Sequence, residues 1–323
     1  MKKPVKNRLA RFLGKGRPFK SGWPHHFIFF KYLNAQEVIV EASRQLNSGI
    51  DDMAIDKSRL EVTLGLIHQD SHGYYLTGCF EQLWSDVLIT SRLGGKLPRG
   101  LLGFLGFISQ DLWNIETVLL RLDWQRSLFD KGQLNQEFWM DFAKADIDVY
   151  HIEVRSIFDY LAKSFNLVSN KPGQVSCESF HKLRNWVVNS EKKEKNAETL
   201  GLDLAEVVRT CDWFDGLAGV RNSVVHEGAY TLVFPEKGRI LFQVSKGYAD
   251  LIHFPLLMFN DNVVDFELYA GLHTGYLISF LEEAATRIST RLALKSRNSN
   301  PRSYHLGLLT LSEWMGKVLA LSN

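Results

Sequence analysis

The sequence predicts a mainly α-helical protein, a helical bundle with a small antiparallel β-hairpin insertion. Apolar residues recur with a period near 3.6 in segments of roughly 15 to 30 residues, which is the period of an amphipathic helix. Glycine, proline and charged runs separate these segments, and strand-forming runs occur between residues 230 and 259. Of the 323 residues, 45% are hydrophobic and 23% are charged, a balance typical of globular proteins.

The first 24 residues form a basic arm. Its cations include Lys2, Lys3, Lys6, Arg8 and Arg11, and no acidic residue precedes Glu37. Such an arm is suited to neutralising the phosphates of a nucleic acid. The alternative is a solvated terminus that binds nothing.

Residues 25–132 are expected to form a helical N-terminal region of unknown function. Helices are predicted over residues 35–46, 74–93 and 101–129. Asn34 is a candidate N-cap for the first of them, and Gly94 and Gly95 end the second. His68 and His72 have the spacing of metal ligands, but Asp70 would lie on another face and no third ligand follows. We therefore expect no metal site and no cofactor.

Residues 133–295 are expected to form a second helical domain that carries the hairpin near residues 229–245. Helices are predicted over residues 137–165, 179–189, 202–220 and 263–293, and strands over 230–234, 240–244 and 256–259. The charged run 191–195 is expected as an exposed loop or a frayed helix end. Asp261 or Asn262 is the predicted N-cap of the last helix. Residues 296–323 read as a linker followed by an amphipathic helix.

The helix predicted over residues 137–165 has two distinct faces. One face is apolar and is expected to pack in the core. The other carries Asp148, His151, Arg155 and Asp159 and is expected to be solvated or functional. If it is functional, we expect this face, with Arg155, to border the candidate site that contains Arg221, and Glu153 or Asp159 to pair with Arg221.

The candidate site is the run Arg221-Asn222-Ser223-Val224-Val225-His226, at the end of an amphipathic stretch. Arginine presents a planar fork of donors to phosphate oxygens and keeps its charge, while histidine takes and gives protons near neutral pH. These side chains suit chemistry at a phosphate. The run resembles the motif of the HEPN superfamily, in which an arginine and a polar residue precede a histidine by a few positions.

The resemblance extends over roughly Glu137 to Ala293, with Val154 to Ala162 similar to the long helix that packs on the motif helix in such domains. It implies a metal-independent endoribonuclease that works as a homodimer and cuts RNA by attack of the 2′-hydroxyl. Toxins and antiphage defence effectors have such activities, so an antitoxin or defence-system partner is also implied. His226 would be the general acid or base, Arg221 would stabilise the phosphorane and Asn222 would orient substrate.

Two considerations weigh against catalysis. Five residues along an ideal helix turn through about 140°, so Arg221 and His226 share no face if the helix runs straight through the motif. Both side chains also suit a helix C-terminus, where they bond free carbonyl groups. The alternative function is therefore a noncatalytic HEPN-like module that binds RNA or a partner.

The three cysteines and the hydropathy pattern predict a soluble cytoplasmic protein. Cys79, Cys177 and Cys211 lie far apart in the sequence, without the spacing of a metal or redox motif, and their odd number argues against a disulfide framework. No apolar run reaches the roughly 18 residues that a membrane span requires. We expect no membrane partner.

Overall fold

The computed structural model describes residues 69–70, 73–74, 77–226, 233–236, 239–244, 258–260 and 262–294. Side chains are described for residues 77–221, 233–234, 240–244 and 262–294. This part of the chain is mainly helical with a small antiparallel sheet, which confirms the predicted fold class at that level. Within these ranges no helix combines the length and the apolar character that crossing a bilayer would need.

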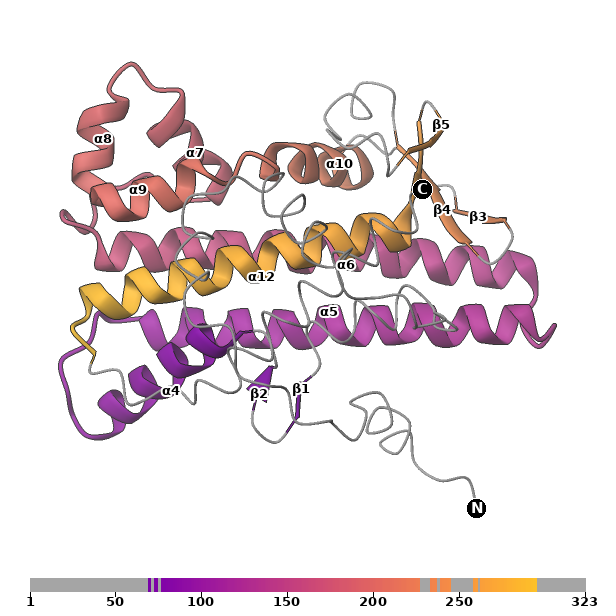
Figure 1. Cartoon of the computed structure of the whole chain (residues 1–323), viewed down its shortest axis with the longest axis horizontal. Helices are drawn as coiled ribbons and strands as arrows, with labels where there is room; N and C mark the ends of the chain where they lie inside the picture. The colour runs from indigo at the N-terminus through magenta and orange to yellow at the C-terminus, as the bar shows by residue number, and fades with distance from the viewer. Residues whose placement is uncertain are drawn as a thin grey trace, which may run out of the picture.

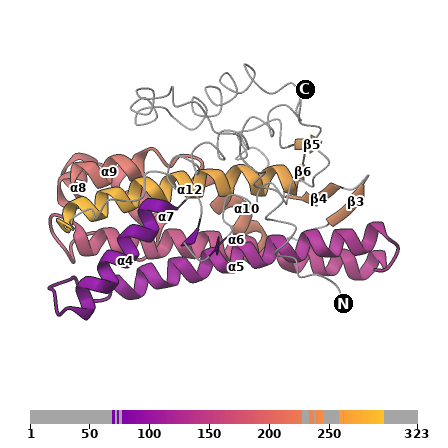
Figure 2. The ribbon, with the colours of Figure 1, turned by 60° about the horizontal axis from the view of Figure 1, so that its bottom comes forward.

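Two long antiparallel helices, α5 (Leu101–Asp130) and α6 (Gln136–Val168), form the base of the molecule (Figure 1). The side chain of Asn135 caps α6 by accepting a hydrogen bond from the Glu137 backbone N–H. A third long helix, α12 (Phe266–Arg291), lies across this pair as a second layer (Figure 2). The side chain of Asp265 caps it by accepting from the backbone N–H groups of Glu267 and Leu268.

The border that we drew at residues 132/133 falls in the turn between α5 and α6. One hydrophobic cluster nevertheless joins residues on both sides of that turn, from Phe80 in α4 to Ile288 in α12. The helix α4 (Gly78–Arg92) packs against α12, and its first N–H groups are capped from there. Glu282 accepts from the backbone N–H groups of Cys79 at 2.8 Å and Phe80 at 3.1 Å.

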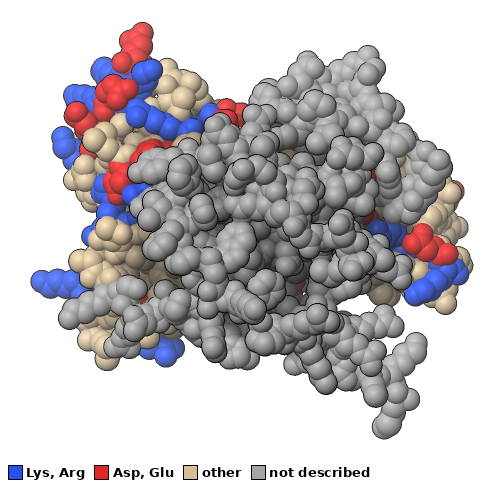
Figure 3. All heavy atoms as spheres, viewed as in Figure 1, with Lys and Arg blue, Asp and Glu red and all other residues tan. Residues whose placement is uncertain are grey.

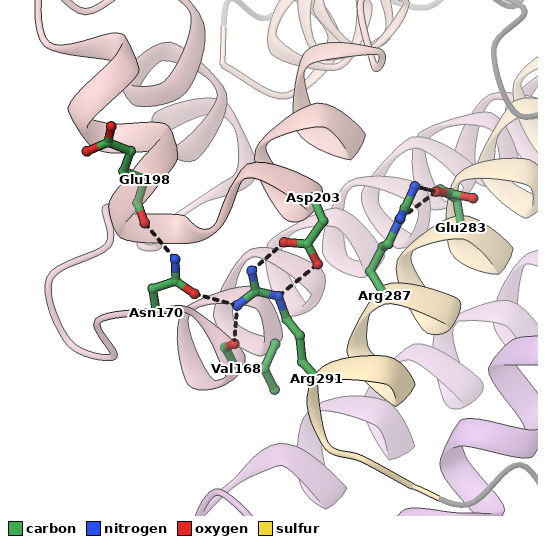
Figure 4. A network of polar contacts seen from close by, with 7 residues as sticks. All are labelled: Val168, Asn170, Glu198, Asp203, Glu283, Arg287 and Arg291. Carbon is green, nitrogen blue, oxygen red and sulfur yellow. Dashed lines mark hydrogen bonds and ion pairs between the residues drawn. The ribbon is translucent and has the colours of Figure 1, made fainter.

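Three short helices, α7 (Phe180–Val188), α8 (Lys193–Leu200) and α9 (Leu202–Arg209), gather at one end of the long helices. Arg291 at the end of α12 ties this group to α6, donating to the Asp203 carboxylate, the Val168 carbonyl and the Asn170 side chain (Figure 4). Figure 3 shows that acidic and basic side chains are intermixed at this end. It therefore presents no surface of a single charge sign on that face.

The strands form a four-stranded antiparallel sheet in the order β3-β4-β6-β5. The strands are β3 (Val233–Glu236), β4 (Arg239–Gln243), β5 (Met258–Asn260) and β6 (Val263–Asp265). A separate pair, β1 (Gln69–Asp70) and β2 (Gly73–Tyr74), lies before α4. The predicted hairpin is present as β3 and β4, with Phe234 opposite Leu241. It is half of a larger sheet, because β6 pairs with β4.

Two local predictions were wrong. The expected helix over residues 202–220 is two helices, α9 and α10 (Phe214–His226), because the chain turns at Asp212, whose carboxylate accepts from the Trp213 backbone N–H. The charged run 191–195 is exposed as predicted and forms a turn and the start of α8. The last helix begins at Phe266 with Asp265 as its cap, since residues 263–265 pair as β6.

Candidate functional site

The candidate motif lies on α10, and the helix runs through all six of its residues. The positions of Arg221 and His226 are therefore about 140° apart around the helix axis. The structure describes the side chain of Arg221, whereas those of Asn222 and His226 lie outside the described side chains. Their roles stay predictions.

The first turn of α10 is held by aromatic packing and an ion pair. Phe214 lies at the centre of a buried ring cluster, with ring centroids 4.9 Å from Phe158 and 4.8 Å from Phe180. Asp215 pairs with the buried Arg184 of α7. Because burial of aromatic rings contributes strongly to packing, this cluster holds the N-terminal half of the motif helix against α6.

Arg221 lies beside Arg155 and Asp159 of α6. Burial lowers the pKa of the Arg221 guanidinium, the positive charge of Arg155 lowers it further, and the negative charge of Asp159 opposes both. Arginine remains protonated at neutral pH despite such shifts. Two guanidinium groups and the Asp159 carboxylate therefore lie together where α6 and α10 meet. The helix face predicted to border the motif does so at Arg155 and Asp159.

Asp159 and Arg155 are themselves held in place by several contacts. Arg155 Nε donates to Asp159 Oδ1 at 3.5 Å, and its guanidinium carbon lies 5.5 Å from the centre of the Phe214 ring. The same Asp159 oxygen accepts from the Phe180 backbone N–H at 2.8 Å, at the start of α7. The carboxylate therefore serves the helix terminus as well as the arginines.

Glu153 does not lie with this group, contrary to the expectation. Its Oε2 accepts from Asn114 Nδ2 of α5 at 3.1 Å. It also raises the pKa of the neighbouring Asp111, whose pKa is raised chiefly by burial. Asp111 is only 8% exposed, so the two carboxyl groups form a polar contact between α5 and α6.

His151 was also placed wrongly on the solvated face, because it is fully buried. Its Nδ1 lies 2.7 Å from the Ile147 carbonyl, and its Nε2 lies 3.0 Å from the Tyr269 hydroxyl. A carbonyl only accepts, so Nδ1 carries the proton and Nε2 accepts from Tyr269. Burial lowers the pKa of His151 to about 4, and His273 next to Tyr269 is shifted in the same way. Both rings are neutral at neutral pH.

Other predicted site residues lie outside the described part of the chain. They are the basic arm with Lys2, Lys3, Lys6, Arg8 and Arg11, and the histidines His68 and His72. Among the residues that are described, no group of three or more histidine, cysteine or acidic side chains is arranged to hold a metal ion.

The half-buried acids Glu81 and Glu282 were not predicted from the sequence. Burial raises the pKa of each to about 7, and the negative charge of Glu282 raises that of Glu81 further. A helical spacing cannot reveal such a pair, because α4 and α12 are two hundred residues apart in the chain. In the sequence, the clue to such a pair is an acidic residue at a helix position that otherwise belongs to the apolar face.

Comparison with known proteins adds no relative: no family model, no curated protein and no solved structure matches this chain.

Proposed function

We propose that this protein is a metal-independent endoribonuclease of HEPN type that acts in the cytoplasm, in a toxin or antiphage defence setting. The observation that carries the proposal is that Arg221 of α10 and Arg155 of α6 lie close together, with Asp159 beside them. Two neighbouring guanidinium groups suit the phosphate of an RNA backbone. The motif histidine follows on the same helix.

In this proposal the cleavage reaction is an intramolecular transfer at phosphorus. A base removes the proton of the ribose 2′-hydroxyl, the oxygen attacks the adjacent phosphorus, and the 5′ oxygen leaves with a proton. His226 moves protons, Arg221 stabilises the additional negative charge of the phosphorane, and Asn222 orients the substrate. Arg155 adds a second cation near Arg221. The products are a cyclic phosphate and a 5′-hydroxyl.

The path of α10 favours a second candidate, a noncatalytic module that binds RNA or a partner protein. Because the helix continues to His226, one protomer presents Arg221 and His226 on different faces. A nuclease of this kind would need Arg221 to reach around the helix, or a second copy to supply one of the two groups. Binding without cleavage is what the second candidate predicts.

The test is RNA cleavage by the full chain in the presence of EDTA. Structured RNA is incubated with the wild type, Arg221→Ala and His226→Ala, and the new ends are checked for cyclic phosphate. We expect each variant to lose about two to four orders of magnitude in rate. Arg209→Ala and His181→Ala are matched controls, because these side chains lie on α9 and α7 and should leave the rate unchanged.

The nuclease proposal fails if the wild type cuts no RNA, or if Arg221→Ala and His226→Ala cut as fast as the controls. Tight RNA binding without cleavage would establish the noncatalytic module instead. Loss of wild-type activity in EDTA would contradict the metal-independent reaction.

A further inference from the structure

The α5–α6 pair exposes two apolar stripes. On α5 the stripe consists of Trp113, Thr117, Leu120 and Trp124, and the two tryptophans are 54% and 62% exposed. On α6 it consists of Phe138, Phe142, Ala145, Val149 and Ile152, with Phe138 and Phe142 at 59% and 49%. Exposed aromatic residues at this density are unusual for a solvated helix face.

Both stripes lie on the side of the helix pair that is turned away from α12. The α12 side is marked by Arg126, which pairs with Glu267, and by Tyr150, whose hydroxyl donates to the Ala270 carbonyl. At 100° per residue, Trp124 is about 160° from Arg126 on α5, and Ile152 is about 160° from Tyr150 on α6. The side chains that join α5 to α6, such as Asn114 and Glu153, lie between the side that faces α12 and the opposite side, which carries the stripes. The two stripes are therefore parts of one outer face.

The spacing of the stripes is that of a helix-packing seam. The steps along α5 are 4, 3 and 4 residues, and those along α6 are 4, 3, 4 and 3. A 3.5-residue repeat keeps a stripe against a partner helix over several turns, whereas a face that only meets solvent needs no such repeat. The partner that fits this face is another helical surface.

The exposed area approaches what a stable dimer requires. The six large apolar side chains of the stripes, from Leu120 at 42% to Trp124 at 62%, leave on the order of 600 Å² of apolar surface exposed. A standard interface buries about 800 Å² on each partner, and a monomer rarely shows a contiguous apolar patch of this size. This face therefore already exposes most of the area that one partner buries in a standard interface.

We propose that this outer face of α5 and α6 binds a second copy of the chain. The helices are antiparallel and carry stripes of the same spacing, so a two-fold axis places each stripe of one copy against a stripe of its partner. The product is a four-helix arrangement of α5 and α6 from both copies. The proposal stands on these exposed stripes and holds whether or not the motif cuts RNA.

The charges on this face do not favour a nucleic acid or an anionic membrane. Arg121 and Arg155, two cations beside the stripes, are already paired with Asp146 and Asp159. Asp141 and Asp148 lie along the outer side of α6. A surface that binds phosphates would carry an excess of cations instead.

The test is the mass of the full chain in solution, measured by sedimentation velocity over a concentration series. We expect a dimer for the wild type and a monomer for the double variant Trp124→Glu/Phe142→Glu, because four added carboxylates meet across the two-fold axis. Leu202→Glu on α9 is the matched control, since Leu202 is 64% exposed and lies off this face. Circular dichroism and thermal unfolding check that all variants remain folded.

A charge-swap arm makes the test specific for self-association. Trp124→Lys/Phe142→Lys should also be monomeric, and an equimolar mixture of the Glu and Lys variants should recover the dimer by at least about tenfold in affinity over either alone. A monomeric wild type, or Glu variants that dimerise as well as Leu202→Glu, would overturn the proposal. A monomeric wild type whose Glu variant unfolds at lower temperature would assign the face to a segment of the same chain, which also overturns it.

Discussion

The hydroxyl of Tyr269 donates a hydrogen bond to Nε2 of His151 across the interface between α12 and α6, at 3.0 Å. The other ring nitrogen of His151 donates to the Ile147 carbonyl within α6, which determines the tautomer. The ring of His273 lies 4.1 Å from that of Tyr269, and its Nδ1 lies 2.8 Å from the Tyr269 carbonyl. A buried polar layer thus joins the two long helices beside the sheet residue Phe242.

Tyr269→Phe should destabilise the protein. The substitution preserves the ring but leaves Nε2 of His151 buried without its donor, which costs about 1 to 3 kcal/mol. Urea unfolding measures the change. Tyr160→Phe is the control, because the Tyr160 ring lies partly exposed between α5 and α6 and should cost less. Equal stability of Tyr269→Phe and the wild type would show that this hydrogen bond contributes nothing.

Acid should destabilise the protein through His151 and His273. Burial lowers the pKa of each to about 4, whereas an unfolded histidine titrates near about 6.5. The unfolded chain therefore binds the proton first. The stabilisation is complete above pH 6.5 and is lost as the pH falls towards 4, by on the order of 3 kcal/mol for each ring.

The measurement is the free energy of unfolding at about pH 7 and about pH 4.5 for the wild type and His273→Gln. The variant should lose less stability on acidification. His181→Gln, at an exposed histidine of α7, should keep the wild-type slope. If all three proteins lose the same amount, buried neutral histidine does not explain the acid sensitivity.

Asp159→Asn should strengthen anion binding at the candidate site. The amide still provides an oxygen that can accept from the Phe180 backbone N–H, while a carboxylate that acts on Arg221 loses its charge. We expect about three- to tenfold tighter binding of a short single-stranded RNA at low salt, shrinking as salt screens the site. Fluorescence anisotropy measures the affinity, with Arg155→Ala expected to weaken it. Unchanged affinity in both variants would show that RNA does not approach these side chains.

Gly201→Ala should destabilise the end of the bundle that α7, α8 and α9 form. Gly201 has a φ of +110°, and an added Cβ would collide with the Arg291 guanidinium, which bridges Asp203 and Val168 (Figure 4). Strain and loss of that bridge should cost at least about 2 kcal/mol. Gly103→Ala in α5 is the control, because nothing lies within 4 Å of the added carbon and helix propensity favours alanine. Thermal unfolding measures the stability of both variants. If Gly103→Ala destabilises the protein as much as Gly201→Ala, the collision with Arg291 does not explain the effect.

The effect of Glu282→Gln on stability should be more favourable at alkaline pH than at acid pH. Burial raises the pKa of Glu282 to about 7, so its folded form holds a proton that the unfolded chain releases near about 4.5. The stability that the folded protein gains by holding this proton is present below pH 4.5 and is lost as the pH rises through 7. A glutamine has one accepting oxygen where Glu282 uses two, so it can accept from only one of the Cys79 and Phe80 backbone N–H groups, a loss that applies at every pH.

We therefore expect the melting temperature of Glu282→Gln, relative to the wild type, to be higher at about pH 8.5 than at about pH 5.5. Glu283→Gln is the control, since Glu283 is more exposed and pairs with Arg287. A difference that does not vary with pH would mean that Glu282 is ionised in the folded protein throughout.

The sequence by itself determined the mainly helical class and the positions of α5, α6 and α7 to within three residues. These elements depend on local physics, namely a 3.6-residue apolar period and caps such as Asn135 and Ser179. It also located the motif at the end of a helix. The breaks at Asp212 and at β6 depend on one side-chain contact and on strand pairing, which periodicity does not record.

Only the tertiary structure decided which polar residues of α6 lie together. His151, Glu153, Arg155 and Asp159 alternate around one helix, so the sequence could not tell which neighbour each would meet. Packing placed His151 against Tyr269, turned Glu153 towards Asn114 and brought Arg155 and Asp159 to Arg221. The physical reason is that a helix specifies the angles between its side chains, while the partners at each angle come from elements distant in the chain.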